Sequence, residues 1–176
     1  MERTMTVVGA ADRPASPEVR FNALFARHYP AVFGYAVRRV GRDEAGDAAA
    51  EVFTVAWRRL GRVPAEPGTL PWLFGVARKV VANQERAARR RLRLEARAAA
   101  SPAGAVEGPG TAGLDVEAAL VRLGRADREL LRLAAWEEMQ PAEIAVVLGC
   151  SPNAAAVRLH RARQRLAGEF QSEGRP

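Results

Sequence analysis

The sequence predicts an all-α protein made of two small helical domains joined by a flexible linker, and three observations support this fold class. Apolar residues recur near a 3.6-residue period in the long segments. No run alternates apolar and polar residues convincingly over the length of a strand. The stretch AAASPAGAVEGPGTAG separates the two halves and contains almost no large apolar residue. A chain of 176 residues with 48% hydrophobic content suffices for two small cores.

The first half carries three amphipathic segments, and we predict a helical domain over residues 21–98. The first segment runs from residue 21 to 40 and is followed by Gly41, a helix stop, although Pro30 is expected to kink or break it. The second begins at Asp43, a candidate N-cap, and Gly61 closes it. The third begins at Trp72 after a loop rich in Pro and Gly, and continues into an arginine-rich stretch. Residues 1–20 are expected to be a disordered N-terminal extension.

The second half follows an expected linker over residues 99–113, and we predict a second helical domain over residues 114–170. Its last part, PAEIAVVLGCSPNAAAVRLHRARQRL, has the pattern of a helix-turn-helix. Gly149 allows the tight turn, Ser151 caps the second helix, and Pro152 occupies its first turn, where a missing N–H costs nothing. Val157 and Leu159 are expected on or near the buried face.

The second helix of this motif is a candidate for reading DNA. Burial of its apolar face leaves an outward set of residues for solvent or DNA: Asn153, Ala154, Arg158, Arg161 and Arg165. In a recognition helix the early residues meet base edges and the later basic residues meet phosphates. The alternative from spacing alone is an ordinary helical hairpin with a solvated arginine face.

The charge of the chain favours a polyanionic partner. The formal net charge is +7 and the sequence pI is near 11.0, so nucleic acid is the leading candidate. The segment from Arg78 to Arg97 follows Trp72 and Phe74, a combination that suits single-stranded or melted nucleic acid. The alternative is that both aromatics belong to the core, and the helical period favours the core for at least one of them. Asp47 and Glu51 lie four residues apart on one helical face, where they either grip a basic partner or solubilise the helix.

Several function classes find no support in the residues. The chain has one cysteine, Cys150, and two histidines, His28 and His160, without the spacing of a metal site, and it has no phosphate-binding glycine motif. We therefore expect a protein that is not an enzyme and that uses no metal and no cofactor. The N-terminus lacks the apolar core of a signal peptide and no segment reaches the length of a membrane span, so we expect a cytoplasmic protein without membrane insertion.

Most of the chain resembles a known family, the extracytoplasmic-function (ECF) group of bacterial RNA polymerase sigma factors. Residues 21–98 resemble sigma region two, and residues 114–167 resemble sigma region four. The segments that carry the resemblance are FARHYPAVFGYAVRRVG, EVFTVAWRRL, PWLFGVARKVVANQERAARRR, DRELLRLAAWEEMQPAEIAVVLGCSP and RLHRARQRL. Ala50 departs from the family, which often has Gln there, and Asn83 stands where Asp is common.

The resemblance implies a subunit that joins core RNA polymerase, recognises promoters, melts DNA and starts transcription. Region two would dock on the clamp helices of the beta-prime subunit, and the matching acids are Asp47 and Glu51. The third helix and the loop before it would capture the unwound non-template strand of the minus-ten element. The matching residues there are Trp72, Arg78, Lys79, Asn83 and Arg86.

Region four would read the minus-thirty-five element of promoter DNA and contact the beta flap of the polymerase. The candidate reading residues are Ser151, Asn153, Ala154, Arg158 and Arg161. Control by a separate anti-sigma factor is an expectation from the family alone. The alternative function is a free-standing helix-turn-helix regulator that does not bind core polymerase and whose first half serves as a dimerisation or sensor domain.

Overall fold

The computed structural model describes residues 16–99 and 114–173, and every element in these two ranges is a helix. This confirms the predicted all-α class. The expected linker lies outside the described residues except for Ala99, the last residue of a helix. The helices are α1 (Pro17–Val40), α2 (Arg42–Arg58), the short 3-10 helix η1 (Leu60–Arg62), α3 (Thr69–Ala99), α4 (Leu114–Arg122), α5 (Arg125–Ala135), α6 (Pro141–Leu148) and α7 (Pro152–Glu173).

The first domain is a three-helix unit in which α1, α2 and α3 all pack on one another. Large apolar side chains from each helix fill its centre, among them Val32, Val52 and Phe74, each exposed by no more than 1%. Small residues on α2, such as Ala45 and Ala49, are fully buried, and they allow the neighbouring helices to approach closely.

The start of α1 differs from the prediction. Ser16 caps the helix by accepting a hydrogen bond from the backbone N–H of Val19 at 3.4 Å, and Pro17 occupies the first turn. Residues 17–20 therefore belong to α1 and not to a disordered extension. Pro30 lies inside α1 without ending it. The N-cap of α2 is Gly41 and not Asp43, which instead lies in the first turn, where its charge favours the helix dipole.

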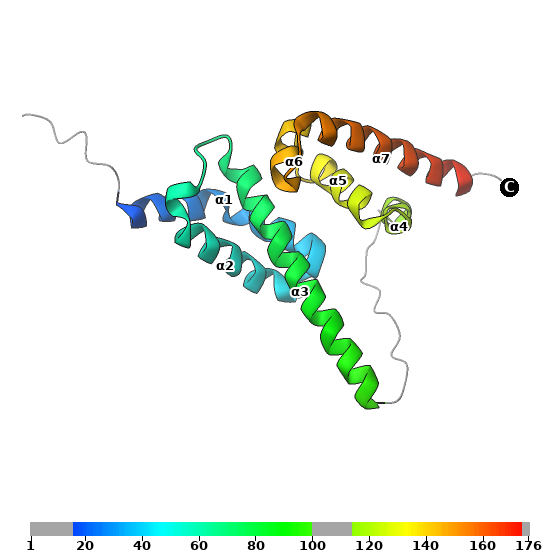
Figure 1. Cartoon of the computed structure of the whole chain (residues 1–176), viewed down its shortest axis with the longest axis horizontal. Helices are drawn as coiled ribbons and strands as arrows, with labels where there is room; N and C mark the ends of the chain where they lie inside the picture. Colours follow the sequence, from blue (N-terminus) through cyan, green and yellow to red (C-terminus); the bar gives the residue numbers. More distant parts are fainter. Residues whose placement is uncertain (1–15, 100–113, 174–176) are drawn as a thin grey trace, which may run out of the picture.

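The second domain comprises α4 to α7, with α7 packed against the other three helices. Leu133, Ile144 and Leu159 bring α5, α6 and α7 together in a common core. Both domains lie side by side in Figure 1, with α6 against the first part of α3. The backbone of α6 approaches α3 at Gly75, where an added Cβ would lie 3.7 Å from the Cα of Val147. Gly75 therefore permits close contact between the domains.

None of the described helices is by itself both long enough and apolar enough to cross a membrane. The bent pair α6 and α7 meets that test only when both helices are joined across a 103° bend, and only by length and composition.

Candidate nucleic-acid interface

The helix-turn-helix is built by three local devices that fix the angle between α6 and α7. A capping box closes the start of α6, where the backbone N–H of Gln140 donates to Glu143 Oε2 at 2.8 Å. Gly149 ends α6 with a φ of 68°, a left-handed conformation that glycine adopts without strain. Ser151 Oγ then accepts the backbone N–H of Ala154 at 3.2 Å and caps α7. The predicted cap and turn are both confirmed.

The buried face of α7 is formed by Ala155, Leu159 and Ala162, each exposed by 3% or less. This leaves the predicted reading residues outward: Ser151, Asn153, Arg158 and Arg161 are exposed and Ala154 is half-buried. Val157 is 42% exposed, so its predicted burial was wrong. The helix is turned so that its small alanines face the core, and this places Val157 among the outward residues.

Arg165 has a partner within its own domain. Its guanidinium forms an ion pair with Asp127 on α5, which holds the side chain against the protein. Arg163 lies on the other flank of α7 and lines an apolar groove with Leu120 and Trp136. The arginines of α7 thus divide between the outward face, an internal ion pair and the groove.

The candidate minus-ten residues lie along α3, before and within its arginine-rich part. Phe74 is buried in the core, whereas Trp72 is half-buried and packs at the edge of the core. Thus one of the two aromatics belongs entirely to the core and the other keeps part of its ring accessible. The polar candidates, Arg78, Lys79, Asn83 and Arg86, are all exposed. Arg86 donates a hydrogen bond to the side-chain carbonyl of Asn83.

Asp47 and Glu51 are both exposed on α2, on the side opposite the buried Ala48, Ala49 and Val52. Beside this face lies an aromatic cluster that sequence reasoning missed. The ring of Trp57 on α2, 43% exposed, stands edge-on to Phe21 of α1 with ring centroids 5.1 Å apart. The signal available in the sequence was the spacing of aromatic residues along α1 at four-residue intervals.

The loop before α3 borders a cavity of about 350 Å³ against α1, also missed from the sequence. His28 is 6% exposed, and its Nε2 lies 2.7 Å from Glu66 Oε1. Arg27 approaches the same carboxylate at 3.5 Å, and Arg20 also lines the cavity. The loop and α1 are therefore joined by charged and polar side chains next to the candidate minus-ten helix.

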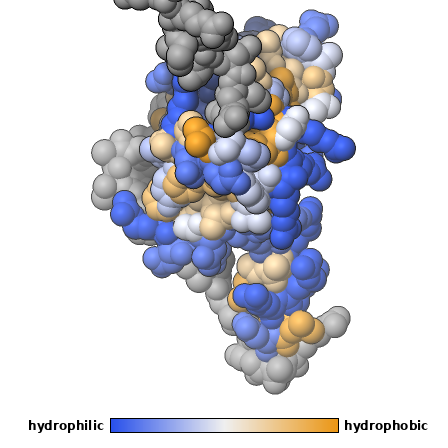
Figure 2. Space-filling view, turned by 90° about the vertical axis from the view of Figure 1, so that its left-hand side faces the viewer, coloured by the Kyte–Doolittle hydropathy of each residue, from blue (hydrophilic) through white to orange (hydrophobic). Residues whose placement is uncertain are grey.

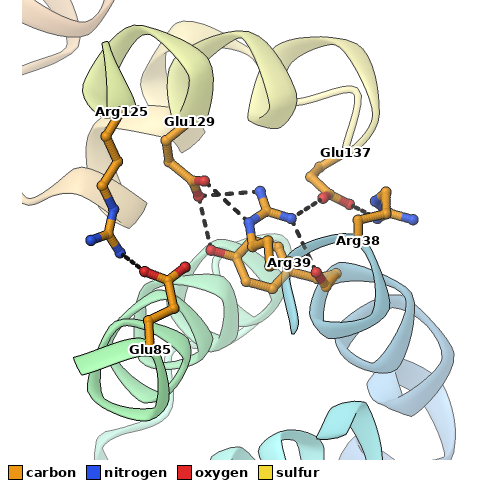
Figure 3. A network of polar contacts seen from close by, with 7 residues as sticks. Arg38, Arg39, Glu85, Arg125, Glu129 and Glu137 are labelled. Atoms are coloured by element: carbon orange, nitrogen blue, oxygen red, sulfur yellow. Dashed lines mark hydrogen bonds and ion pairs between the residues drawn. The ribbon is translucent and has the colours of Figure 1, made fainter. Parts of the chain in front are cut away.

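A polar network joins the two domains (Figure 3). Arg39 on α1 is only 4% exposed and pairs with Glu129 on α5 and with Glu137, each at 3.1 Å. The hydroxyl of Tyr35 donates to Glu129 at 2.8 Å, and burial, followed by the negative charge of Glu129, raises the pKa of Tyr35 above its ordinary value. Sequence reasoning missed this network because its partners lie more than 80 residues apart.

Two peripheral ion pairs extend the network. Arg38 pairs with the second oxygen of Glu137, and Arg125 on α5 pairs with Glu85 on α3 at 2.6 Å. Among the residues that the structure describes, no group of three or more His, Cys, Asp or Glu side chains is arranged to hold a metal ion.

The three sets of sequence-predicted residues therefore lie on three helices, α2, α3 and α7. The hydrogen bond between Asn83 and Arg86 connects two members of one set. Neither a hydrogen bond nor an ion pair joins one set to another across the described ranges. Each set lies on the outward side of its own helix, where Trp72 and Ala154 are half-buried and the other members are exposed.

Comparison with known proteins accounts for both domains. Residues 24–91 match the family Sigma-70 region 2, and residues 113–166 match the family Sigma-70, region 4. The RNA polymerase sigma factor CarQ of Myxococcus xanthus is 36% identical over 166 residues, covering 87% of this chain and 92% of that protein.

Two solved structures share the fold. The sigma factor RpoE of Bartonella quintana, in complex with the anti-sigma factor NepR, is 22% identical with a TM-score of 0.63, covering 86% of this chain and 96% of that one. CnrH, in complex with the cytosolic domain of CnrY, is 25% identical with a TM-score of 0.60, covering 88% and 89%. Because both sigma-70 regions match this chain and CarQ is 36% identical over 87% of it, the chain belongs to the ECF group of RNA polymerase sigma factors, which direct the polymerase to promoters.

Proposed function

We propose that this sigma factor binds core polymerase and the two promoter elements through three separate helical faces. Asp47 and Glu51 on α2 bind the clamp helices of the beta-prime subunit. The outward residues of α3 capture the unwound non-template strand of the minus-ten element, and the outward residues of α7 read the minus-thirty-five element. The single observation that carries this assignment is the exposure of each set on a helix whose opposite face is buried.

The residues on α3 suit a melted strand. The accessible part of Trp72 offers a ring on which a base can stack, and stacking on an aromatic contributes about 1 to 3 kcal/mol per base. Arg78 and Lys79, both exposed, supply positive charge for phosphates, while Asn83 and Arg86 add hydrogen-bonding groups. Side chains that were buried and already paired within the protein could not bind a melted DNA strand in this way.

The residues on α7 suit duplex DNA. Asn153 and Ala154 lie in the first turn, which a recognition helix presents to base edges in the major groove. Arg158 and Arg161 are exposed one and two turns later, where they reach phosphates or guanine edges. The apolar groove lined by Leu120, Trp136 and Arg163 lies on the other flank of α7, where the proposed contact with the polymerase flap would leave the DNA face free.

Regulation by an anti-sigma factor is part of the proposal. It is supported by the fact that RpoE of Bartonella quintana was solved with an anti-sigma factor. We expect such a partner to compete with core polymerase for this chain.

Copurification and run-off transcription test the proposal together. The chain should bind core polymerase and enable transcription from a subset of a promoter library, and it should bind duplex DNA weakly when alone. A chain that fails to join core polymerase yet shifts duplex DNA tightly would instead support the free-standing regulator. Promoter-dependent transcripts made only when both chain and core are present are the expected result.

A further inference from the structure

The polar network between the domains has its donors on one side and its acceptors on the other. The first domain contributes the hydroxyl of Tyr35 and the guanidinium groups of Arg38 and Arg39, which we call the donor cluster. The second domain contributes the carboxylates of Glu129 and Glu137. Nε and Nη2 of Arg39 reach the two oxygens of Glu129 at 3.1 and 3.2 Å, and its Nη1 reaches Glu137 at 3.1 Å. The donor cluster is therefore an anion-binding site that holds two carboxylates of its own chain.

The first domain alone keeps the guanidinium of Arg39 in place. It lies 3.4 Å from the centroid of the Tyr35 ring, and its Nη1 also donates to the backbone carbonyl of Tyr35 at 3.1 Å. The Tyr35 ring in turn stacks on Phe74 of α3, with centroids 5.1 Å apart. A planar guanidinium matches the oxygens of a phosphate as well as those of a carboxylate. The donor cluster would therefore keep its geometry if the second domain moved away.

The counter-charges of the donor cluster all come from the second domain. In the described part of the chain, the ion pairs of Arg38 and Arg39 go to Glu129 and Glu137, and none goes to a carboxylate of the first domain. The side chains of Arg39 and Glu137 are only 4% and 3% exposed. Departure of the second domain would thus leave two positive charges without an internal partner.

The second domain also covers part of the face of α3 that is proposed to hold the melted strand. Gly75 lies three residues after Trp72 and four before Lys79, positions that share one side of an α-helix. Here α6 packs on α3, and a Cβ added to Gly75 would lie 3.7 to 3.8 Å from backbone atoms of Val146 and Val147. A strand that contacts Trp72 and Lys79 together would have to pass over Gly75. Capture of the strand therefore requires α6 to leave, and its departure uncovers the donor cluster.

The uncovered cluster would lie beside the path of this strand. Phe74, on which the Tyr35 ring stacks, directly precedes Gly75 in α3. From its contact with α6, α3 runs to the lower end of the molecule in Figure 1, and Figure 2 shows this end as mainly hydrophilic with small apolar spots. A charged DNA backbone along α3 thus meets a polar surface, with the donor cluster on its flank.

We propose that the donor cluster binds a backbone phosphate of the promoter DNA held on α3, and that Glu129 and Glu137 occupy the same site in the free chain. This inference rests on the proposed function, because it takes α3 to hold the melted strand. Carboxylates and phosphate exclude each other, since both are anions that need the same donors. The chain exchanges its internal ion pairs for a phosphate contact, which adds affinity without reading sequence.

Neutral replacements of single phosphates test the contact in the holoenzyme. Each phosphate around the minus-ten element of a promoter selected from the library is replaced in turn by a methylphosphonate, which removes its charge. Wild-type holoenzyme should lose about tenfold or more in affinity at the phosphate that the cluster holds, as expected for a charge-assisted hydrogen bond. Arg39→Gln should weaken binding to the unmodified promoter by a similar factor and lose nothing further at that position. Arg42→Gln, at an exposed residue of α2, should keep the wild-type profile.

The profiles separate this inference from the proposed function. An Arg39→Gln profile that matches wild type at every phosphate would overturn the inference, whereas wild-type binding that does not depend on the minus-ten element would count against the proposed function. Loss of folding is a risk for Arg39→Gln because Arg39 is buried, so Arg38→Gln, at a side chain that is 34% exposed, is measured in parallel. It should reduce the loss at the same phosphate. An unchanged profile with weaker binding to core polymerase would assign the cluster to an acidic protein surface and overturn its assignment to DNA.

The free chain tests the exchange of carboxylates for phosphate. Without core polymerase, Glu129→Gln with Glu137→Gln should bind single-stranded minus-ten DNA about threefold or more tightly than wild type, because more of the chain is open to DNA. Adding Arg39→Gln to this double variant should lower the affinity again by about tenfold. In the holoenzyme on its promoter the double variant should match wild type. Equal affinity of the free wild-type and double-variant chains, or no loss on adding Arg39→Gln, would overturn the proposal.

Discussion

At the scale of single residues, Tyr35 shows how burial and charge together constrain one group. Its ring stacks on Phe74 with centroids 5.1 Å apart, and the guanidinium of Arg39 lies 3.4 Å from its ring centroid. Its hydroxyl donates to Glu129 across the boundary between the domains. Ionisation of Tyr35 would place a second negative charge beside Glu129 in a buried site, which is unfavourable.

The unfavourable ionisation of buried Tyr35 predicts that the stability of the fold falls at alkaline pH. The pKa of Tyr35 is raised in the folded chain above its ordinary value of 10.0. Its contribution to stability is therefore fully present below about pH 10 and is lost as the pH rises further. The chain has two tyrosines, so a Tyr29→Phe variant leaves Tyr35 as the single phenol. Phenolate absorbance in that variant should appear only well above pH 10, together with loss of helical circular dichroism. Phenolate formation near pH 10 in a still helical protein would contradict the assignment.

Asp47 and Glu51 allow a second prediction at this scale. Replacing them with the shape-matched amides, Asp47→Asn and Glu51→Gln together, removes charge from an exposed face without disturbing the core. We expect affinity for core polymerase to fall by at least tenfold, about 1.4 kcal/mol, with thermal unfolding unchanged. Glu95→Gln, exposed on α3, is the control and should bind core as wild type does. Core affinity that is undiminished in the double variant would remove these residues from the interface.

At the scale of elements, the helix-turn-helix was predictable from sequence because its determinants are local. Gly149, Ser151 and Pro152 act on their immediate neighbours, so their spacing suffices. Val157 was placed wrongly because the exact rotation of α7 depends on which side chains α5 and α6 offer, and those are set by packing. The cap of α2 was misplaced for a related reason: the chain turns at Gly41, and the helix begins before Asp43 can cap it.

Arg158 and Arg161 on the exposed face of α7 are the proposed contacts with the minus-thirty-five element. Arg158→Ala with Arg161→Ala should reduce run-off transcription by at least tenfold from promoters that depend on the minus-thirty-five element, because phosphate or base contacts each contribute about 1 to 3 kcal/mol. Arg62→Ala removes the same kind of charge from an exposed position in the first domain, and holoenzyme carrying it should bind the duplex element as tightly as wild type. If the double variant transcribes normally, the outward face of α7 is not the reader.

At the scale of the whole molecule, the packed arrangement of the two domains is incompatible with reading both promoter elements at once. The names of the elements imply a separation of about 25 base pairs, or roughly 85 Å at 3.4 Å per base pair. The domains touch where α6 meets Gly75 of α3, and α7, with 22 residues, spans only about 33 Å. The domains must therefore separate when both faces engage a promoter. No sequence pattern indicated that the two domains pack together, because the network in Figure 3 joins residues on either side of the linker.

The network at the domain boundary supplies the final prediction. Glu129→Gln with Glu137→Gln would leave Arg39, 4% exposed, without a carboxylate, and an uncompensated buried charge costs about 3 to 5 kcal/mol. Separation of the domains relieves this cost by returning Arg39 to water, while each domain keeps its own core. Small-angle scattering should therefore show a radius of gyration larger by on the order of a few ångströms, with helical content retained. Glu138→Gln, the same change at the exposed neighbouring residue, should leave the radius at its wild-type value. If the double variant stays as compact as wild type, apolar contact around Gly75 and Val147 holds the domains together and the ion pairs do not.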